Sequence, residues 1–303
     1  MATQKLKSLA YIGTFGISAF ITGTYFERKF SPQHNLKNPQ DSPIFSTVFA
    51  ATAVSPVPSE TNVGRISQIM KYGFPGLDNV RSFDNFVLSY DKRNRVAHWV
   101  FEHITPECCK PNDQVDRALS EFTPDESIHP FFRSLNSDYY KSGYDRGHLA
   151  AAGNHRVTQK MVNQTFLLSN MAPQVGVGFN RDSWNRLERY VRRLTRTFKN
   201  VYCCTGPLYL PRKEANGKNY VKYEVIGANH VAVPTHFFKV VVCETKDGQF
   251  EMESYVMPNQ VISDDTPLTS FMVPPETIER AAGLLFFDNI ARSKFSKINH
   301  KKN

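Results

Sequence analysis

Hydrophobic residues recur at regular spacing from Ile66 to about Ile290, without a break in composition. Apolar residues make up 41% of the 303 residues, which is enough to build a core. A pattern sustained over this length predicts one domain rather than a string of small modules. We place this domain at residues 64–295 and expect a basic tail over 296–303.

Runs that alternate apolar and polar residues predict strands in several parts of the domain. Segments 85–91 and 96–104 flank the short sequence KRN and predict a β-hairpin. Segments 200–210 and 230–242 are also rich in strand-forming residues, with Pro234 marking a bulge or an edge position.

The segment 181–199 carries the clearest helical pattern in the chain. Asn180, which directly precedes it, is a suitable N-cap residue. Strands before and after helices in mixed order favour an α+β fold over a doubly wound parallel sheet. Spacings of three and four residues place one apolar stripe along the helix, formed by Trp184, Leu187, Val191, Leu194 and Phe198.

An uncharged run from Leu9 to Phe26 has basic residues on both sides, and no acidic residue occurs before Glu27. About 20 apolar residues cross a bilayer, so this run lies at the lower limit of spanning length. We predict a mitochondrial targeting or membrane-anchor segment over 1–30, with a secretory signal as the alternative. Segment 31–63 is rich in Pro, Ser, Asn and Thr and predicts a linker.

The net charge indicates the class of partner, and the cysteines indicate which structural sites the chain lacks. Lys and Arg outnumber Asp and Glu by 37 to 28, and the net charge of +9 favours a polyanion such as nucleic acid or an anionic membrane face. The five cysteines include no C-x-x-C pair, which argues against a disulfide framework and against a cysteine zinc site.

The sequence "YDRGH" places Asp145, Arg146 and His148 close together. Histidine is the usual general base near neutral pH, and a guanidinium binds phosphate oxygens. The pair therefore suits an anionic substrate, with the imidazole activating water. Asp145 either orients the imidazole or bonds to a nearby backbone turn.

A general base alone does not account for phosphodiester hydrolysis. Base catalysis contributes about 10² to 10⁴ fold, whereas enzymes reach roughly 10⁶ fold and far beyond. A metal ion is therefore expected, and Mg²⁺ needs few protein oxygens because it keeps several waters. Asn180 is the candidate ligand, and a plain helix cap is the alternative interpretation of this residue.

Four segments in fixed order resemble the DNA/RNA non-specific ββα-metal nucleases. The similarity extends over residues 71–287. It implies a ββα-metal (His-Me finger) fold, in which a mixed, mainly antiparallel sheet is flanked by helices. The segments are "DRGH" at 145–148, "LSNMAPQ" at 168–174, "FNRDSWNRLE" at 179–188 and "TGPLYLP" at 205–211.

The resemblance implies a role for each matching residue. His148 matches the general base, and Arg146 matches an arginine that contacts phosphate. Asn180 matches the metal ligand, and Asn170 matches an asparagine that supports the base and its water network. Glu188 matches a helix glutamate that holds water of the metal shell.

Further residues match less directly. Arg192 matches an arginine one turn after Glu188, and the alternative is an ordinary helical ion pair worth about 0.2–0.5 kcal/mol. A second arginine that stabilises the transition state should lie upstream of Asp145, where Arg117 is our candidate. His155 is expected to be structural.

Basic residues on or beside the 181–199 helix can follow a phosphate backbone, and a solvated face is the alternative. We take Arg192, Arg193 and Arg196 as candidate nucleic-acid contacts, with Arg189 and Lys199 beside them.

The resemblance also implies an activity and a cellular setting. We expect an endonuclease that uses Mg²⁺, for which Mn²⁺ can substitute, and that cleaves DNA and RNA to 5′-phosphate and 3′-hydroxyl ends. The implied protein is a homodimer of the mitochondrial intermembrane space that reaches nuclear DNA on release in cell death and degrades it in apoptosis. Its N-terminal segment would contact the mitochondrial membrane before processing. The alternatives are an exo/endonuclease paralogue, a catalytically idle nucleic-acid-binding protein of this fold, and a lipid-interacting membrane protein.

Overall fold

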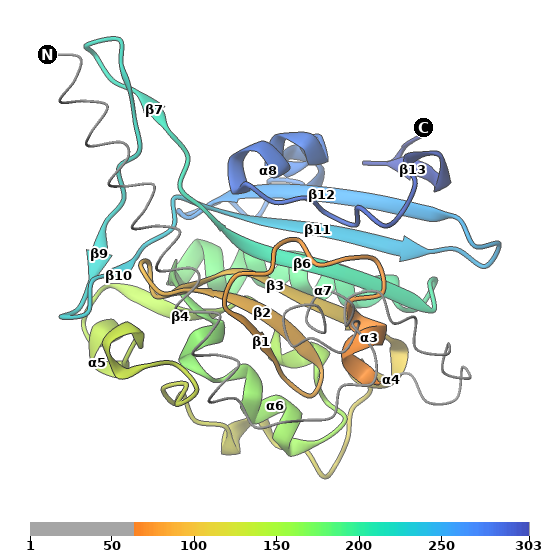
Figure 1. Cartoon of the computed structure of the whole chain (residues 1–303), viewed down its shortest axis with the longest axis horizontal. Coiled ribbons are helices and arrows are strands. Elements are labelled where there is room, and N and C mark those ends of the chain that lie inside the picture. Colours follow the sequence, from red (N-terminus) through yellow and green to blue (C-terminus); the bar gives the residue numbers. More distant parts are fainter. Residues whose placement is uncertain (1–63, 303) are drawn as a thin grey trace, which may run out of the picture. The chain divides into compact units, whose positions relative to one another are not determined.

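The computed structural model describes residues 64–302 (Figure 1). The predicted targeting segment at 1–30 and the predicted linker at 31–63 lie outside the described residues. Among the residues that are described, no helix combines the length and the apolar character needed to cross a membrane.

One mixed, mainly antiparallel sheet of eight strands forms the centre of the domain, in the order β1-β2-β3-β6-β11-β12-β13-β14. Neighbouring strands run antiparallel except β12 and β13, which are parallel. This sheet and its flanking helices confirm the predicted α+β fold. The strands are β1 (Val80–Ser82), β2 (Phe86–Asp91), β3 (Val96–Ile104), β6 (Asn200–Leu208), β11 (His236–Glu244), β12 (Phe250–Pro258), β13 (Phe295–Ile298) and β14 (Lys301–Lys302).

The predicted hairpin is present as β2 and β3. The run 230–242, expected as a single β-rich stretch, instead divides into β10 (Val231–Ala232) and β11. Pro234 lies in the connection between them, because a proline has no N–H to donate to a strand ladder. Its carbonyl accepts a hydrogen bond from Nδ2 of Asn259 at 2.9 Å. The short strand β10 pairs with β9 (Val225–Ile226).

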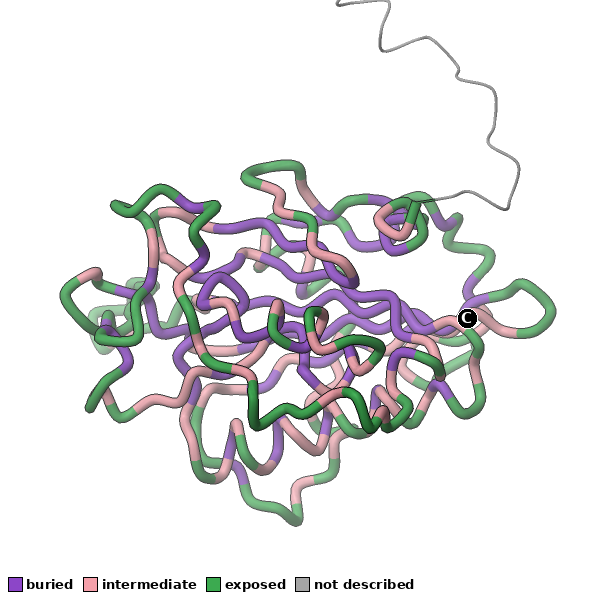
Figure 2. The backbone as a smooth tube through the Cα atoms, turned by 90° about the horizontal axis from the view of Figure 1, so that it is seen from below, coloured by how far each residue is buried: buried purple, intermediate pink, exposed green. Residues whose placement is uncertain are grey.

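The sheet buries apolar side chains on both faces, because successive residues of a strand point to opposite sides. One face carries Val100, Cys203 and Val241, and packs against the elements that hold the DRGH motif and the long helix. The opposite face packs against α3 (Arg65–Ile69) and α8 (Pro275–Ala282). Figure 1 shows α8 and the region of β4 and α6 on opposite sides of the sheet. Figure 2 shows the buried strands at the centre and the exposed segments around them.

The C-terminal segment belongs to the sheet. The sequence predicts a basic tail over 296–303, but β13 pairs with β12 and β14 pairs with β13. Phe295 is buried, with its ring centroid 5.9 Å from that of Phe250. Asn299 Oδ1 accepts a hydrogen bond from the Ser254 backbone N–H at 2.8 Å. Burial of Phe295 and backbone pairing therefore hold this segment in the sheet, although its lysines suggest a solvated end.

The remaining elements are short and lie around the sheet. All five cysteines are free, as their spacing predicts. The short elements are α4 (Pro106–Cys109), α5 (Asn136–Tyr139), α6 (Gln159–Thr165), the hairpin of β7 (Arg212–Lys213) and β8 (Asn219–Tyr220), and single 3-10 turns at Arg117–Leu119, Pro130–Phe132, Ala152–Asn154, Leu168–Asn170, Leu268–Phe271 and Arg292–Lys294.

Candidate active site

Two strands and a helix carry the predicted site. β4 (Tyr144–His148) pairs antiparallel with β5 (Met171–Val175), with Gly147 opposite Ala172. The chain then enters a helical segment, Gly176–Trp184, that continues as α7 (Asn185–Leu194). The arrangement of strand, strand and helix brings the DRGH motif next to the start of the helix.

The helix begins differently from the prediction. Gly178 has a φ of 85° and lies at a kink, and its N–H donates to Oδ2 of Asp182 at 2.6 Å. Asp182 thus bonds back to an N–H that precedes it, and Asn180 lies inside the helical segment, where no side-chain cap bond is formed. α7 ends at Leu194 rather than Lys199, because residues 195–197 form a turn. The apolar stripe is confirmed by the burial of Trp184, Leu187 and Val191.

A cavity of ≈ 490 Å³ collects most of the predicted site residues. Asn170, Arg193 and Arg196 do not line it. The cavity is lined by Asp145, Arg146, His148, Asn180, Glu188, Arg192 and Arg117, which the sequence singled out, and by Phe122, Ala152, Gly153, Arg181 and Asn185, which it did not.

His148 ends β4 with its ring edge-on to Phe166, at 4.7 Å between ring centroids. Its Nε2 is buried and has no hydrogen-bond partner among the described residues. Burial, reinforced by the positive charge of Arg117, lowers the pKa of His148 to about 3. The imidazole is therefore neutral at physiological pH and can accept a proton.

Asn180 is oriented by Asp145, whose Oδ2 accepts a hydrogen bond from Asn180 Nδ2 at 2.9 Å. Within the described residues, no hydrogen bond uses Oδ1 of Asn180. Arg181 binds the same carboxylate through Nε at 2.8 Å and Nη2 at 2.7 Å. The hydrogen bond from Arg181 is the main reason that the pKa of Asp145 is lowered.

Asp145 therefore does not orient the imidazole of His148, which was one of the two interpretations of the motif. No hydrogen bond joins these two side chains in the described part of the chain. The reason is the alternation of a strand: Arg146 and His148 share one face, and Asp145 points to the other. Asp145 instead bonds to residues at the helix start.

Arg146 is held at the rim of the cavity. Its Nη1 donates to Oδ1 of Asn136 at 2.7 Å, and its Cζ lies 4.2 Å from the centroid of the Phe122 ring. A guanidinium has five N–H donors, so this contact leaves donors for an anion. Arg117 lines the same cavity from a separate 3-10 turn.

Asn170 is fully buried and bonds only to backbone groups. Its Oδ1 accepts from the Ala150 N–H at 2.9 Å, and its Nδ2 donates to the carbonyls of Ala150 at 3.0 Å and Thr165 at 2.8 Å. Its own carbonyl accepts from the Leu149 N–H at 3.0 Å. Asn170 thus fixes the backbone that follows His148 and acts as a positioning residue.

Glu188 and Arg192 lie one turn apart on the cavity wall. Burial raises the pKa of Glu188, and the positive charges of Lys239 and Arg192 oppose this shift. No ion pair joins Glu188 to Arg192 among the described residues. Arg192 Nη1 instead donates to Oδ1 of Asn154 at 3.1 Å. The helical ion pair considered as the alternative for these residues is therefore not formed.

Two further candidate nucleic-acid contacts face solvent, one on α7 and one in the turn that follows it. Arg193 and Arg196 are exposed, and Arg193 Cζ lies 5.8 Å from the centroid of the Tyr190 ring.

His155 is buried, with its Nε2 at 3.0 Å from Oε1 of Glu102 and its Nδ1 at 2.9 Å from Nδ2 of Asn85. These contacts agree with the structural role predicted for His155.

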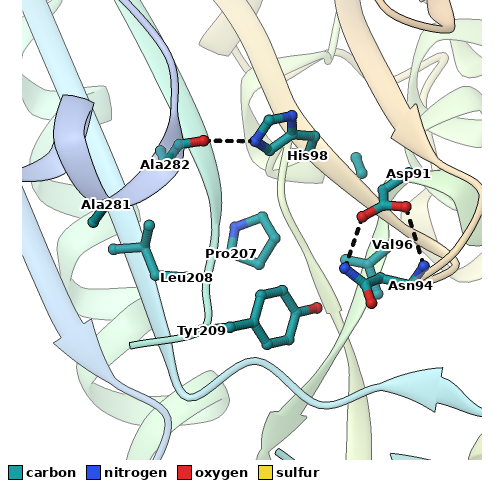
Figure 3. A pocket seen from close by; sticks show the side chains of 10 residues that line it. Asp91, Asn94, Val96, His98, Pro207, Leu208, Tyr209, Ala281 and Ala282 are labelled. Atoms are coloured by element: carbon teal, nitrogen blue, oxygen red, sulfur yellow. Dashed lines mark hydrogen bonds between the residues drawn. The ribbon is translucent and has the colours of Figure 1, made fainter. Parts of the chain in front are cut away.

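A different hollow, of ≈ 200 Å³, lies beside the turn of the β2–β3 hairpin (Figure 3). Its polar groups bond mainly to one another. His98 Nε2 lies 2.9 Å from the Ala282 carbonyl, and Asp91 Oδ2 accepts from Asn94 Nδ2 at 2.7 Å. It holds none of the predicted site residues and no buried charge without a partner.

The donor set of the larger cavity suits a hard divalent cation. Among the described residues, no group of three or more His, Cys, Asp and Glu side chains could hold a metal. Among the described residues, Oδ1 of Asn180 accepts no hydrogen bond, and Glu188 faces the same cavity. Mg²⁺ accepts such a site because it binds oxygen and retains several waters.

Several residues of the cavity escaped the sequence prediction. Arg181, Asn185, Glu188 and Arg192 recur at spacings of four, three and four, and so form a polar stripe beside the apolar one. That spacing was the available signal for Arg181 and Asn185. Phe122 comes from an irregular segment, and no local pattern marks it.

A histidine on the first of two antiparallel strands and an asparagine on the following helix define a ββα-metal nuclease. The family model described as DNA/RNA non-specific endonuclease matches residues 65–293. The chain belongs to this family, and it is a hydrolase of the nuclease class that acts on nucleic acid.

Named relatives agree with this assignment. The mitochondrial endonuclease G of Caenorhabditis elegans is 51% identical over 278 residues, which cover 86% of this chain and 90% of that protein. The mitochondrial endonuclease G of Homo sapiens is 55% identical over 223 residues, 74% of each chain. A crystal structure of an EndoG/EndoGI complex contains a chain 68% identical, with a TM-score of 0.78, over 82% of this chain and 99% of that one.

Proposed function

We propose that this chain is a Mg²⁺-dependent endonuclease with little sequence preference that cleaves DNA and RNA to 5′-phosphate and 3′-hydroxyl ends. The observation that carries the proposal is the shared cavity, in which the unpartnered Nε2 of His148 and the cationic Arg146 and Arg117 surround one space. A neutral base and cations around one space suit a phosphodiester and an attacking water.

The residues divide the work. His148 accepts the proton of the water that attacks phosphorus, and its neutral state at physiological pH keeps it ready to do so. Arg146 and Arg117 bind the phosphate oxygens and stabilise the charge that develops on them. Asn180 would hold the divalent ion through Oδ1, with Glu188 facing it. When bound, the ion neutralises charge on the phosphate and on the leaving oxygen.

The exposed arginines on α7 and in the turn after it support the lack of sequence preference. Contacts from Arg193 and Arg196 to phosphates would add affinity for any sequence, because the backbone carries no sequence information. Mn²⁺ also binds oxygen ligands and would substitute for Mg²⁺ in the same site.

The proposal extends to location and assembly. We place the protein in the mitochondrion, in the intermembrane space, as a homodimer that reaches nuclear DNA after release in cell death. The mitochondrial names of its relatives and the basic, acid-free start of the chain support the mitochondrial placement. Deleting residues 1–30 should abolish mitochondrial location of a reporter fusion while nuclease activity persists. Continued mitochondrial location would contradict this assignment.

The division of labour can be tested with two variants of the full chain. His148→Ala should lower single-turnover cleavage by about 10² fold or more and leave DNA affinity in chelator unchanged. Asn180→Ala should instead raise the Mg²⁺ concentration required for half-maximal cleavage. His98→Ala, in the other hollow, is the matched control. No cleavage by the wild-type chain with any divalent metal would identify an idle nucleic-acid-binding protein.

A further inference from the structure

A second cavity, of ≈ 560 Å³, adjoins the active site. It shares Asp145 and Arg146 with the catalytic cavity, so Arg146 stands in the wall between the two. Its volume lies within the roughly 300–1,000 Å³ range of small-molecule sites. The other lining residues come from α5 and the turn that leads into β4, and they are Asn136, Ser137, Tyr139, Tyr140, Lys141 and Tyr144.

An exposed aromatic ring forms part of this cavity. Tyr140 is 72% exposed, although large aromatic side chains are usually packed away from water. The Nζ of Lys141 lies 5.2 Å from the centroid of this ring. Lys141 has a φ of 56°, a left-handed conformation that non-glycine residues adopt at a cost. The turn therefore presents a flat ring and a cation together at the mouth of the cavity.

A second tyrosine of the cavity is buried. Tyr139 is 5% exposed and lines the cavity, and its hydroxyl makes no hydrogen bond within the described residues. Because this oxygen has almost no accessible surface, a molecule in the cavity would meet the ring of Tyr139 and not its hydroxyl. Of these two neighbouring tyrosines, Tyr140 is the accessible one.

The lining of the cavity carries charges of both signs. Asp145 contributes a carboxylate, which already pairs with Arg181 at 2.7 Å. The cations of the lining are Lys141 and Arg146, and they can contact the phosphates on either side of a base. The hydroxyl of Tyr144 donates at 2.8 Å to Oε2 of Glu224, which does not line the cavity.

We infer that this second cavity binds an unpaired nucleobase of the nucleotide that adjoins the cleaved phosphate. Tyr140 stacks on the base, and Lys141, whose Nζ lies 5.2 Å from the centroid of that ring, contacts a neighbouring phosphate. The inference rests on the proposed function, because the neighbouring phosphate occupies the catalytic cavity. It makes the enzyme favour single strands, since a paired base cannot enter. Aromatic stacking tolerates every base, so the site is consistent with cleavage at many sequences.

The test measures binding of the full chain to a single-stranded oligonucleotide in chelator, so that no cleavage occurs. Tyr140→Ala should weaken binding about fivefold or more, the order expected when one base no longer stacks. Tyr140→Phe keeps the ring and should bind like wild type. Tyr220→Ala is the matched control, because Tyr220 is also exposed and has Lys222 Nζ at 5.5 Å from its ring centroid. Tyr140 is exposed, so its substitution leaves the fold intact.

A second arm uses oligonucleotides that lack one base at successive positions. Wild type should lose affinity when the missing base adjoins the cleavage position, and Tyr140→Ala should be indifferent to that gap. Equal affinity and equal sensitivity to the gap in both proteins would overturn the base site and leave the nuclease assignment standing. Failure of wild type to bind any nucleic acid would overturn both.

Discussion

Asn180 donates a hydrogen bond from Nδ2 to the Oδ2 of Asp145 over 2.9 Å. The bond fixes which end of the amide faces the carboxylate, and so leaves Oδ1 for another partner. Asp145 is itself held by two bonds from Arg181. Asp145 thus orients Asn180, the proposed metal ligand, whereas His148 is positioned by packing against Phe166.

Replacing Asp145 should therefore weaken metal use and spare the base. Asp145→Ala removes the acceptor that orients Asn180, so we expect a several-fold higher Mg²⁺ concentration for half-maximal cleavage and a nearly unchanged rate at saturating Mg²⁺. A Mg²⁺ titration of single-turnover cleavage measures both quantities. Asp84→Ala serves as control, because Asp84 also forms a partly exposed ion pair, with Lys160 at 2.8 Å. A lower rate at saturating Mg²⁺ with normal Mg²⁺ demand would contradict this role.

Gly147 is expected to tolerate no side chain. A Cβ at this position would overlap Oε1 of Gln174, which is fully buried and cannot move aside. Gly147→Ala should lower the free energy of unfolding by about 1–3 kcal/mol and reduce cleavage, since His148 is the next residue. Gly64→Ala, which meets nothing within 4 Å, is the control in thermal or urea unfolding. Unchanged stability of Gly147→Ala would show that β4 and β5 can separate without cost.

His103 should make stability depend on pH in the acid range. It is 7% exposed, and burial followed by the charge of Arg65 lowers the pKa of His103 to about 4, from an ordinary 6.5. Above pH 6.5 the folded and unfolded states are both neutral at this residue. Between about 6.5 and 4 the unfolded state takes up a proton first, so stability falls as pH falls.

The effect of His103 on the free energy of unfolding should reach on the order of 2–3 kcal/mol near pH 4. Urea unfolding of His103→Gln at several pH values should therefore show a shallower decline than wild type. His148, whose pKa is also lowered, contributes its own decline in both proteins. An identical slope in the two proteins would mean that His103 titrates normally.

Arg193 on α7 and Arg196 in the turn after it should act through charge alone. Arg193→Gln with Arg196→Gln should weaken binding to all sequences alike and flatten the dependence of log K on log salt by about 0.9 for each phosphate that is no longer neutralised. Binding of duplexes of different sequence at several salt concentrations measures this slope. Arg212→Gln with Lys213→Gln, on the exposed strand β7, gives an equal change of net charge. An unchanged slope in the α7 variant would make its arginines a solvated face.

The sequence predicts those parts of the fold that depend on local periodicity. The β2–β3 hairpin and the apolar stripe through Trp184, Leu187 and Val191 follow from alternation and helical spacing, which are properties of neighbouring residues. The start of the helix does not, because Asn180 bonds to Asp145 on β4 instead of capping the helix, and that contact depends on tertiary packing. The division of 230–242 depends on how Pro234 fits between two strands.

The candidate site likewise contains some residues that a local motif predicts and others that only tertiary packing brings together. Arg146 and His148 share one face of β4 because they are two residues apart, which the motif itself indicates. Arg117, from a 3-10 turn, and Phe122, from an irregular segment, reach the cavity along paths that tertiary packing sets. The absence of a bond between Glu188 and Arg192 has the same origin, because Asn154 from another segment takes the donor of Arg192.

The parallel pairing of β13 with β12 has a consequence for solubility. A chain cut at Lys294 would expose a row of free backbone N–H and C=O groups along β12, and Phe250 would lose the ring that covers it. Such an open edge is a template onto which another molecule can add a strand. Residues 295–302 therefore guard the protein against self-association, because they cover β12 and because the exposed Lys301 and Lys302 place repelling charges on the edge strand β14.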